Sequence, residues 1–198
     1  MGTRTMSRIW TIITMIVRKA KKSSMQTFIM SGPCGSGKTH KATDLARMLH
    51  SEGRSGRIIS TDHFFCGLRG GLRFQDVDSE DVRAALLSYK FDGAMLGEGH
   101  AHTRDLFRSV LNGEFSEDVL IIDNTNISAA EKAVYYDHAS DYGVVTIIRM
   151  ETPLKVCLRR NTHKVPDETI RRMHYMHHAR THSGSLRETM PWWNTVSE

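Results

Sequence analysis

Short apolar runs alternate with helical stretches along the chain from Gln26 onward. Four runs, TFIMS, RIIS, VLII and VVTIIR, have the length and composition of strands and occur at residues 27–31, 57–60, 119–122 and 144–149. VLII is apolar at every position, as expected of a central strand that is buried on both faces. Strands that alternate with helices predict an α/β fold, with a mostly parallel sheet flanked by helices.

The helices are predicted from spacing and from their end signals. Residues 38–51 place apolar side chains on one helical face (Ala42, Leu45, Ala46 and Leu49). Ser128 and Glu131 form a capping box that begins a helix reaching about residue 141, and Thr152 is the expected N-cap of a short helix whose first position is Pro153. A break at residues 161–166 precedes a last helix over 167–180, whereas residues 66–76 are irregular and helical segments follow to Leu111.

Charge divides the chain into regions. The 198 residues carry a formal net charge of +5, but residues 1–24 hold six Lys and Arg residues and no acidic one, which leaves −1 for the remainder. We therefore expect a basic arm at residues 1–24, one domain over residues 25–182 and a tail at residues 183–198. The three cysteines are odd in number and widely spaced, so no disulfide framework is predicted and a reducing compartment, the cytoplasm, is favoured.

The arm is open to more than one interpretation. Its apolar run, residues 9–17, is too short for a transmembrane segment. Four isoleucines share one helical face between cations, so residues 8–22 are able to make weak contact with a membrane surface or to serve as an organellar targeting segment. Alternatively, Met25 is the natural start and the arm is not part of the working protein.

A Gly-rich segment between the first strand and the first helix carries the most specific signal. Eight consecutive residues fit the pattern G-x-x-x-x-G-K-[ST]: Gly32, Pro33, Cys34, Gly35, Ser36, Gly37, Lys38 and Thr39. Glycines let backbone N–H groups point at phosphate oxygens, beside a helix N-terminus that favours negative charge. Lys38 is expected at the β- and γ-phosphates and Thr39 as a ligand of Mg²⁺. No Asn-Lys-x-Asp sequence follows the later strands, which favours ATP over GTP, and the length fits a small P-loop kinase.

Polar residues follow the second and third strands. Asp62 comes after RIIS, where a carboxylate is able to accept the proton of an attacking hydroxyl. Asp123 follows VLII and is a candidate to hold a Mg²⁺-bound water, with Asn124, Thr125 and Asn126 directly after it. Strand-end turns alone also favour Asp and Asn, so a structural role remains the alternative.

Cations and histidines gather late in the chain. Residues 159–166 form a basic loop between two helices, in which Arg160 is expected to clamp phosphate as part of a helical lid. The histidines of the last helix, His174, His177 and His178 with His163 or His182, lack the cysteine and glutamate partners of a zinc site. His100, with His102 beside it, is the better candidate to contact an acceptor.

These motifs together, GPCGSGKT, STDHFF, YKFD, LIIDNTN and RRNTHKVP, are similar in order and spacing to the polynucleotide-kinase-like P-loop kinases, from about Gln26 to about His178. The resemblance implies an ATP-dependent kinase that acts on a 5′-hydroxyl of RNA or DNA. It also implies that Asp62 is the general base and that Arg160 belongs to the lid. Lys38 and Thr39 match the P-loop pair, and Thr125 and Asn126 match the acceptor-side motif.

Two positions depart from this family. Phe65 replaces an arginine that binds the acceptor phosphate in phage-type enzymes, and Asn124 replaces an aspartate. Arg69 and Arg73 are the candidates to substitute for the missing arginine. Both departures concern the acceptor side, so a small metabolite or a nucleoside is an alternative acceptor. A non-catalytic, nucleotide-dependent binding module is a further alternative, against which Lys38, Thr39 and Asp62 argue.

Overall fold

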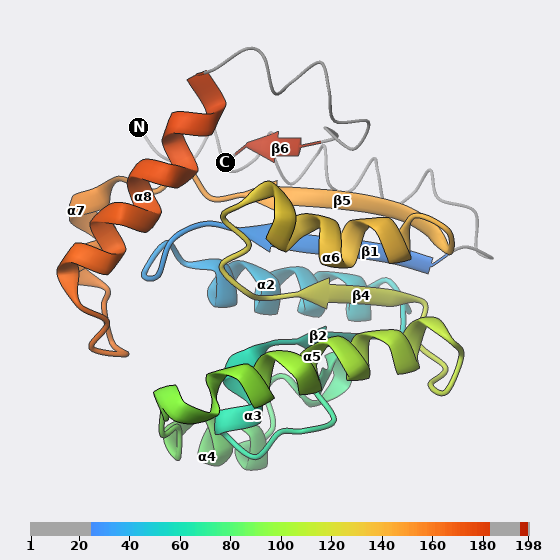
Figure 1. Ribbon diagram of the computed structural model, residues 1–198. Coiled ribbons are helices and arrows are strands. Elements are labelled where there is room, and N and C mark those ends of the chain that lie inside the picture. The colour runs from blue at the N-terminus through green and yellow to red at the C-terminus, as the bar shows by residue number, and fades with distance from the viewer. Residues whose placement is uncertain (1–24, 183–194, 198) are drawn as a thin grey trace. The chain divides into compact units, whose positions relative to one another are not determined.

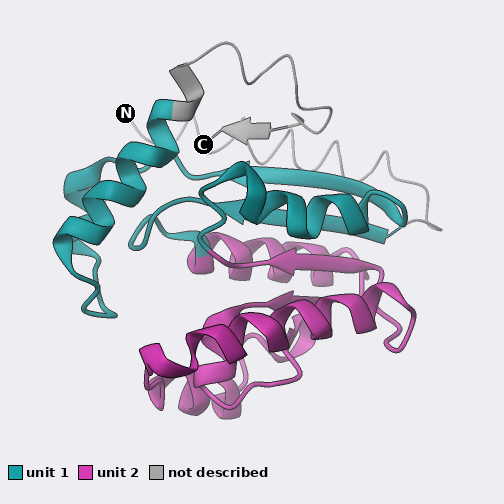
Figure 2. Cartoon of the chain, in the orientation of Figure 1, with its two compact units in different colours: residues 1–38, 125–198 teal, residues 39–124 magenta. Residues whose placement is uncertain are grey.

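The computed structural model describes residues 25–182 and 195–197. The expected basic arm, residues 1–24, and most of the expected tail lie outside the described residues. The chain divides into two compact units, Met1–Lys38 with Thr125–Glu198, and Thr39–Asn124 (Figure 2). We call them unit 1 and unit 2. The chain passes from one to the other at two peptide bonds, after Lys38 and after Asn124.

Unit 1 is built on parallel strands. β1 (Met25–Ser31) pairs in parallel with β5 (Gly143–Arg149), from Met25 opposite Gly143 to Ser31 opposite Arg149. β6 (Thr195–Ser197) adds to the other side of β5, also in parallel (Figure 1). The first two strands were predicted to within two residues at each end. The third lies in the segment predicted as a tail, because three residues are too few to show a periodic pattern.

Three helices complete the described part of unit 1. α6 (Ala129–Ala139) contacts β1 and β5 and begins at the predicted capping box, in which Ser128 and Glu131 bond each other's backbone N–H groups. α7 (Leu154–Arg159) and α8 (Asp167–His182) contact each other (Figure 1). The prediction of Thr152 as the N-cap of α7 was wrong. Pro153 occupies that position without a side-chain bond, and the Thr152 hydroxyl is used elsewhere.

Unit 2 has its own parallel pair. β2 (Gly56–Ile59) runs parallel to β4 (Val119–Ile122), and a two-residue strand, β3 (Leu72–Arg73), lies antiparallel on the other side of β2. All four residues of β4 are buried, as its apolar sequence predicted. The helical elements are α2 (Lys38–Ser51, of which only Lys38 belongs to unit 1), α3 (Thr61–Phe65), η1 (Phe74–Asp76), α4 (Glu80–Leu87), η2 (Gly93–Met95) and α5 (Leu96–Leu111).

The predicted α/β class is confirmed. Within the two units, every described strand pairing is parallel except that of β2 with β3. Residues 57–60 were predicted as one strand, but Ser60 leaves it and caps α3, a short helix that the sequence pattern did not reveal. No helix in residues 25–182 is long and apolar enough to cross a membrane.

Candidate active site

The P-loop, which belongs to unit 1 except for its last residue, Thr39, has the backbone that phosphate binding requires. Gly35 and Gly37 adopt φ angles of 75° and 91°, a conformation that side-chain-bearing residues rarely adopt. A Cβ on Gly35 would also collide with the backbone of Cys157 in α7. The side-chain hydroxyl of Ser36 is buried and has no hydrogen-bond partner among the described residues. A loop with this backbone and an unsatisfied donor fits the phosphates of a nucleotide.

Three segments distant in sequence hold this loop within unit 1. The backbone N–H of Gly32 donates to the carbonyl of Thr125 at 2.9 Å. The Thr152 hydroxyl donates to the carbonyl of Ser36 at 2.8 Å, and the Thr152 carbonyl in turn accepts a hydrogen bond from Nε2 of His174 on α8. The sequence did not single out Thr152 for this role. Its two bonds connect the P-loop with the last helix.

Two cations lie at the P-loop. Nζ of Lys38 donates to the carbonyl of Pro33 at 2.9 Å, so it lies over the loop where phosphates would bind. Nη1 of Arg160, which follows α7 directly, is 3.5 Å from the position that a Cβ on Gly37 would occupy. Burial raises the pKa of the Cys157 thiol, and the charges of Lys38 and Arg160 oppose that rise. Both cations therefore act on the same small region, and the role of Arg160 as a phosphate clamp stays a prediction.

The basic loop after α7 is closed by one side chain. Nδ2 of Asn161 donates to the carbonyl of Val165 at 2.6 Å, and its Oδ1 accepts from the N–H of Val165 at 3.0 Å. Lys164 within the loop has a positive φ of 54°. These bonds give the loop a defined shape next to Arg160, a role for Asn161 that was not foreseen.

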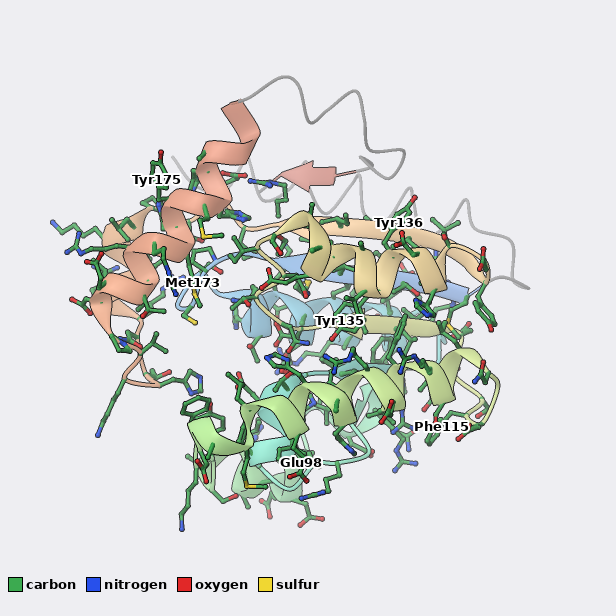
Figure 3. The ribbon with its side chains drawn as sticks, in the orientation of Figure 1. Glu98, Phe115, Tyr135, Tyr136, Met173 and Tyr175 are labelled. Carbon is green, nitrogen blue, oxygen red and sulfur yellow. The ribbon has the colours of Figure 1, made fainter. Side chains whose placement is uncertain are left out.

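α8 also contacts the P-loop through sulfur atoms. Sγ of Cys34 lies 3.9 Å from Sδ of Met173, which is labelled on α8 in Figure 3. Two histidines of the same helix, His174 and His178, stack with ring centroids 4.2 Å apart. In the described part of the chain, no group of three or more His, Cys, Asp or Glu side chains gathers in a way that could hold a metal ion.

Asn126, expected at the acceptor, has a structural role instead. Its side chain is 3% exposed, and Nδ2 donates to the carbonyl of Met30 in β1 at 2.9 Å. Ser31 at the end of β1 donates to the carbonyl of Asn126, whose φ is 41°. This buried amide holds the strand that leads into the P-loop, so we no longer assign it to acceptor binding. Thr125 keeps an accessible side chain next to it, and its acceptor role stays a prediction.

In unit 2, the candidate base is held at the start of α3. Asp62 is exposed and lies in the first turn of this helix, where its N–H donates to Oγ of Ser60 at 3.2 Å. Ser60 donates in turn to the carbonyl of Asp123 at 2.8 Å, and Oδ1 of Asn124 accepts from the N–H of Thr61 at 2.9 Å. The residues that end β4 therefore fix the helix that carries Asp62.

Three further side chains contact this helix turn. Oη of Tyr89 donates to Oδ1 of Asp62 at 3.2 Å. Thr61 forms hydrogen bonds with Nδ1 of His100 at 3.1 Å and with the hydroxyl of Thr103 on α5 at 3.2 Å. His100, predicted at the acceptor, thus lies one residue from the candidate base. Tyr89 belongs to the YKFD motif. Its place beside Asp62 is known only from the hydrogen bond in the structure.

Asp123 and Thr39, the predicted magnesium residues, both belong to unit 2. Asp123 is 5% exposed, and its N–H donates to the carbonyl of Ile59 at the end of β2. Thr39 is exposed in the first turn of α2 and lines a hollow of about 270 Å³ together with His63 of α3 and Arg83 of α4. Hydroxyl and carboxylate oxygens are the donors that Mg²⁺ prefers, so these side chains fit the ion.

A larger hollow in unit 2 lies at the other end of the strands. It measures about 520 Å³ and is lined by residues that begin β2 or precede β4, among them Gly56, Phe115 and Glu117 (Phe115 is labelled in Figure 3). Parallel α/β sheets bind ligands beyond the carboxyl ends of their strands, where Asp62 and Asp123 lie. Size alone therefore does not make this hollow the active site.

The P-loop geometry and its two cations define the class as a P-loop kinase-like, ATP-dependent phosphotransferase. The chain belongs to the family described as an AAA domain, whose model matches residues 28–180. Among curated protein sequences, none matches the chain.

Several solved structures are similar to it. An APS kinase, CysC of Mycobacterium tuberculosis in complex with AMPPNP and APS, is 21% identical over 70% of this chain and 69% of its own, with a TM-score of 0.46. A gluconokinase from Sinorhizobium meliloti 1021 is 10% identical over 89% and 83%, with a TM-score of 0.45. The Pnkp1/Rnl/Hen1 complex is 18% identical over 72% of this chain and 40% of its own, with a TM-score of 0.46. With TM-scores below 0.5, the family match is the comparison that assigns the class.

Proposed function

We propose that this protein transfers the γ-phosphate of ATP to the 5′-hydroxyl of a nucleoside unit, either at the end of RNA or DNA or in a free nucleoside. One observation carries the phosphotransfer part of the proposal: Nη1 of Arg160 lies 3.5 Å from the position that a Cβ on Gly37 would occupy, within the P-loop. An arginine in this place stabilises the charge that develops on a transferring phosphoryl group. A module that only binds nucleotide has no transition state for which such an arginine would be needed.

Each unit has its own part in this proposal. In unit 1, Lys38 neutralises the β- and γ-phosphates and Arg160 binds the γ-phosphoryl oxygens as they gain charge. In unit 2, Thr39 and Asp123 are the side chains that would hold Mg²⁺, which neutralises phosphate charge when bound. Asp62 accepts the proton of the acceptor hydroxyl, and Tyr89 holds its carboxylate by the hydrogen bond to Oδ1.

Two classes of acceptor remain as candidates: the 5′ end of a nucleic acid and a small molecule. The resemblance of the motifs to polynucleotide-kinase-like enzymes favours the 5′ end of RNA or DNA. Phe65 favours a small acceptor, because it stands where those enzymes have the arginine that grips an acceptor phosphate.

The test is to incubate the protein with Mg²⁺ and γ-labelled ATP in the presence of 5′-hydroxyl RNA, 5′-hydroxyl DNA and a panel of nucleosides. We expect label on at least one of these acceptors with the wild-type protein and none with Lys38→Ala. If Mg·ATP stabilises the protein against heat yet no acceptor is labelled, the protein is a binding module and not a kinase.

A further inference from the structure

An aromatic cluster lies beside Asp62 in unit 2. We define it as Phe65 of α3 with Tyr89 and Phe91 of the segment between α4 and η2. The ring centroid of Phe65 is 5.4 Å from that of Phe91 and 6.2 Å from that of Tyr89, in tilted and edge-on arrangements. Tyr89 is the residue whose hydroxyl donates to Asp62. The cluster is therefore one side chain away from the proposed base.

The cluster is open to a ligand on its outer side. Phe91 is 54% exposed, although burial of a large apolar ring ordinarily stabilises the folded state. The side chains of Leu87 and Met95, on either side of this segment, are exposed as well, so Phe91 is not the single exposed apolar residue of this region. A flat aromatic face at the edge of a reaction site is the surface on which planar rings stack.

The two arginines that could bind an acceptor phosphate at this site, Arg69 and Arg73, contact other groups. The guanidinium of Arg69 lies over the ring of Phe64, 4.4 Å from its centroid. Arg73 forms an ion pair with Asp76, with Nε 2.7 Å from Oδ2. These are the two arginines that the sequence offered in place of the one lost at Phe65. Lys90 is the exposed cation in the segment between α4 and η2, and Lys90→Ala is the control variant for Phe91→Ala.

We propose that Phe65, Tyr89 and Phe91 stack against the base of the acceptor, and that the acceptor is a free nucleoside for which no 3′-phosphate is required. This inference rests on the proposed kinase activity and narrows its substrate. The 5′-oxygen forms a bond to the γ-phosphorus of ATP while the bond between the γ-phosphorus and the β–γ bridging oxygen breaks. The hydroxyl proton goes to Asp62, and ADP leaves with the electron pair of the broken bond.

The experiment compares three kinds of acceptor with γ-labelled ATP and Mg²⁺: nucleosides, the same nucleosides carrying a 3′-phosphate, and ribose, which has hydroxyls but no base. We expect nucleosides and their 3′-phosphates to be labelled with similar kcat/KM, and ribose far less. Phe91→Ala should raise the nucleoside KM about ten-fold, the scale of one lost stacking contact, with the ATP KM unchanged. The neighbouring Lys90→Ala should leave both constants as in the wild type.

A substitution in the opposite direction tests the same point. Phe65→Arg restores a cation where related enzymes have one, so it should shift the preference toward the 3′-phosphorylated acceptor. Equal labelling of ribose and nucleosides would overturn the inference. A nucleoside KM of Phe91→Ala equal to that of the wild type would also overturn it. The same holds if the KM for 3′-phosphorylated acceptors rises more in Lys90→Ala than in Phe91→Ala.

A binding measurement separates failure of this inference from failure of the proposed function. Saturation-transfer NMR with adenosine and a non-hydrolysable ATP analogue should show saturation of the base protons by the wild-type protein and much less by Phe91→Ala. If this signal appears but no acceptor is labelled, the stacking site stands and the kinase proposal fails. If labelling occurs without any saturation of the base protons, the kinase proposal stands and the stacking site is wrong.

Discussion

The phenol of Tyr89 donates a 3.2 Å hydrogen bond to Oδ1 of Asp62, across 27 positions of the sequence. This bond ties the candidate base to the segment that carries the aromatic cluster. Tyr89→Phe retains the ring but removes the donor, so the carboxylate loses an orienting contact. We expect kcat to fall several-fold with little change in the acceptor KM, because stacking is retained. Steady-state kinetics on the best acceptor checks this, and a change confined to KM would assign Tyr89 to binding alone.

Lys38→Ala should abolish productive use of ATP, since the β- and γ-phosphates lose their point charge. In a thermal-shift titration with Mg·ATP, the wild-type protein should be progressively stabilised and the variant largely unaffected. Lys155→Ala, an exposed lysine of α7, is the matched control and should behave as the wild type. Equal stabilisation of Lys38→Ala and the wild type would remove Lys38 from the nucleotide site.

Asp62→Asn should bind Mg·ATP nearly as the wild type does but lose phosphotransfer by about 10²-fold or more, the usual scale for a positioned base. An amide preserves the shape and accepts the bond from Tyr89, but it cannot take the proton. Single-turnover rates and ATP dissociation constants measured on the same preparation separate the two effects. Loss of ATP affinity without a specific loss of rate would make Asp62 a structural residue.

Arg160→Lys keeps the charge beside Gly37 but loses the planar, two-pronged guanidinium. If that group acts mainly on the transition state, turnover should fall well beyond any change in ATP affinity. Arg159→Lys, the preceding exposed arginine, is the control and should be nearly silent. Small and parallel changes in affinity and turnover for Arg160→Lys would favour the binding module over the kinase.

Two buried histidines predict how stability depends on pH. Burial lowers the pKa of His63 to about 4 and that of His177 to about 3, against about 6.5 in the unfolded chain. The folded state therefore binds fewer protons than the unfolded state below pH 6.5. Their contribution to stability is complete above that pH and is lost as pH falls from 6.5 toward 4 for His63 and toward 3 for His177.

Together the two histidines add at most about 2.7 kcal/mol per pH unit to the slope of the free energy of unfolding between pH 4.5 and 6, beside the contribution of the carboxylates. His63→Gln should remove about half of this histidine part. Urea unfolding over that pH range measures the slope, so the comparison holds even if the variant is less stable throughout. An unchanged slope would mean that His63 is protonated in the folded state as readily as in the unfolded one.

The parts of the molecule that follow local rules were predictable from the sequence. The P-loop needs glycine at its positive-φ positions, Gly35 and Gly37, and the capping box at Ser128 needs only the residue three positions later. β4 was recognised because burial on both faces requires an unbroken apolar run. In each case the physical requirement acts on neighbouring residues, so it is visible in the order of residue types.

Other parts depend on contacts between distant segments, which residue order does not record. Thr152 was expected to cap α7, but a carbonyl of the P-loop offers its hydroxyl a partner 116 positions away. Asn126 has the residue type of an acceptor ligand, but its amide is buried against β1. Tyr89 lacked any role until its hydrogen bond to Asp62 was visible.

The division of the chain into a continuous unit 2 and a discontinuous unit 1 has a consequence for synthesis. Unit 2, from Thr39 to Asn124, leaves the ribosome before Gly143, the partner of Met25 in β1, does so. β1 must therefore wait for β5, with the backbone hydrogen-bonding groups on that side not yet paired, while unit 2 is free to collapse. Nascent chains halted between these points should consequently be more prone to aggregation than the finished protein, and the nucleotide-binding loop should become competent late, when β5 has joined β1.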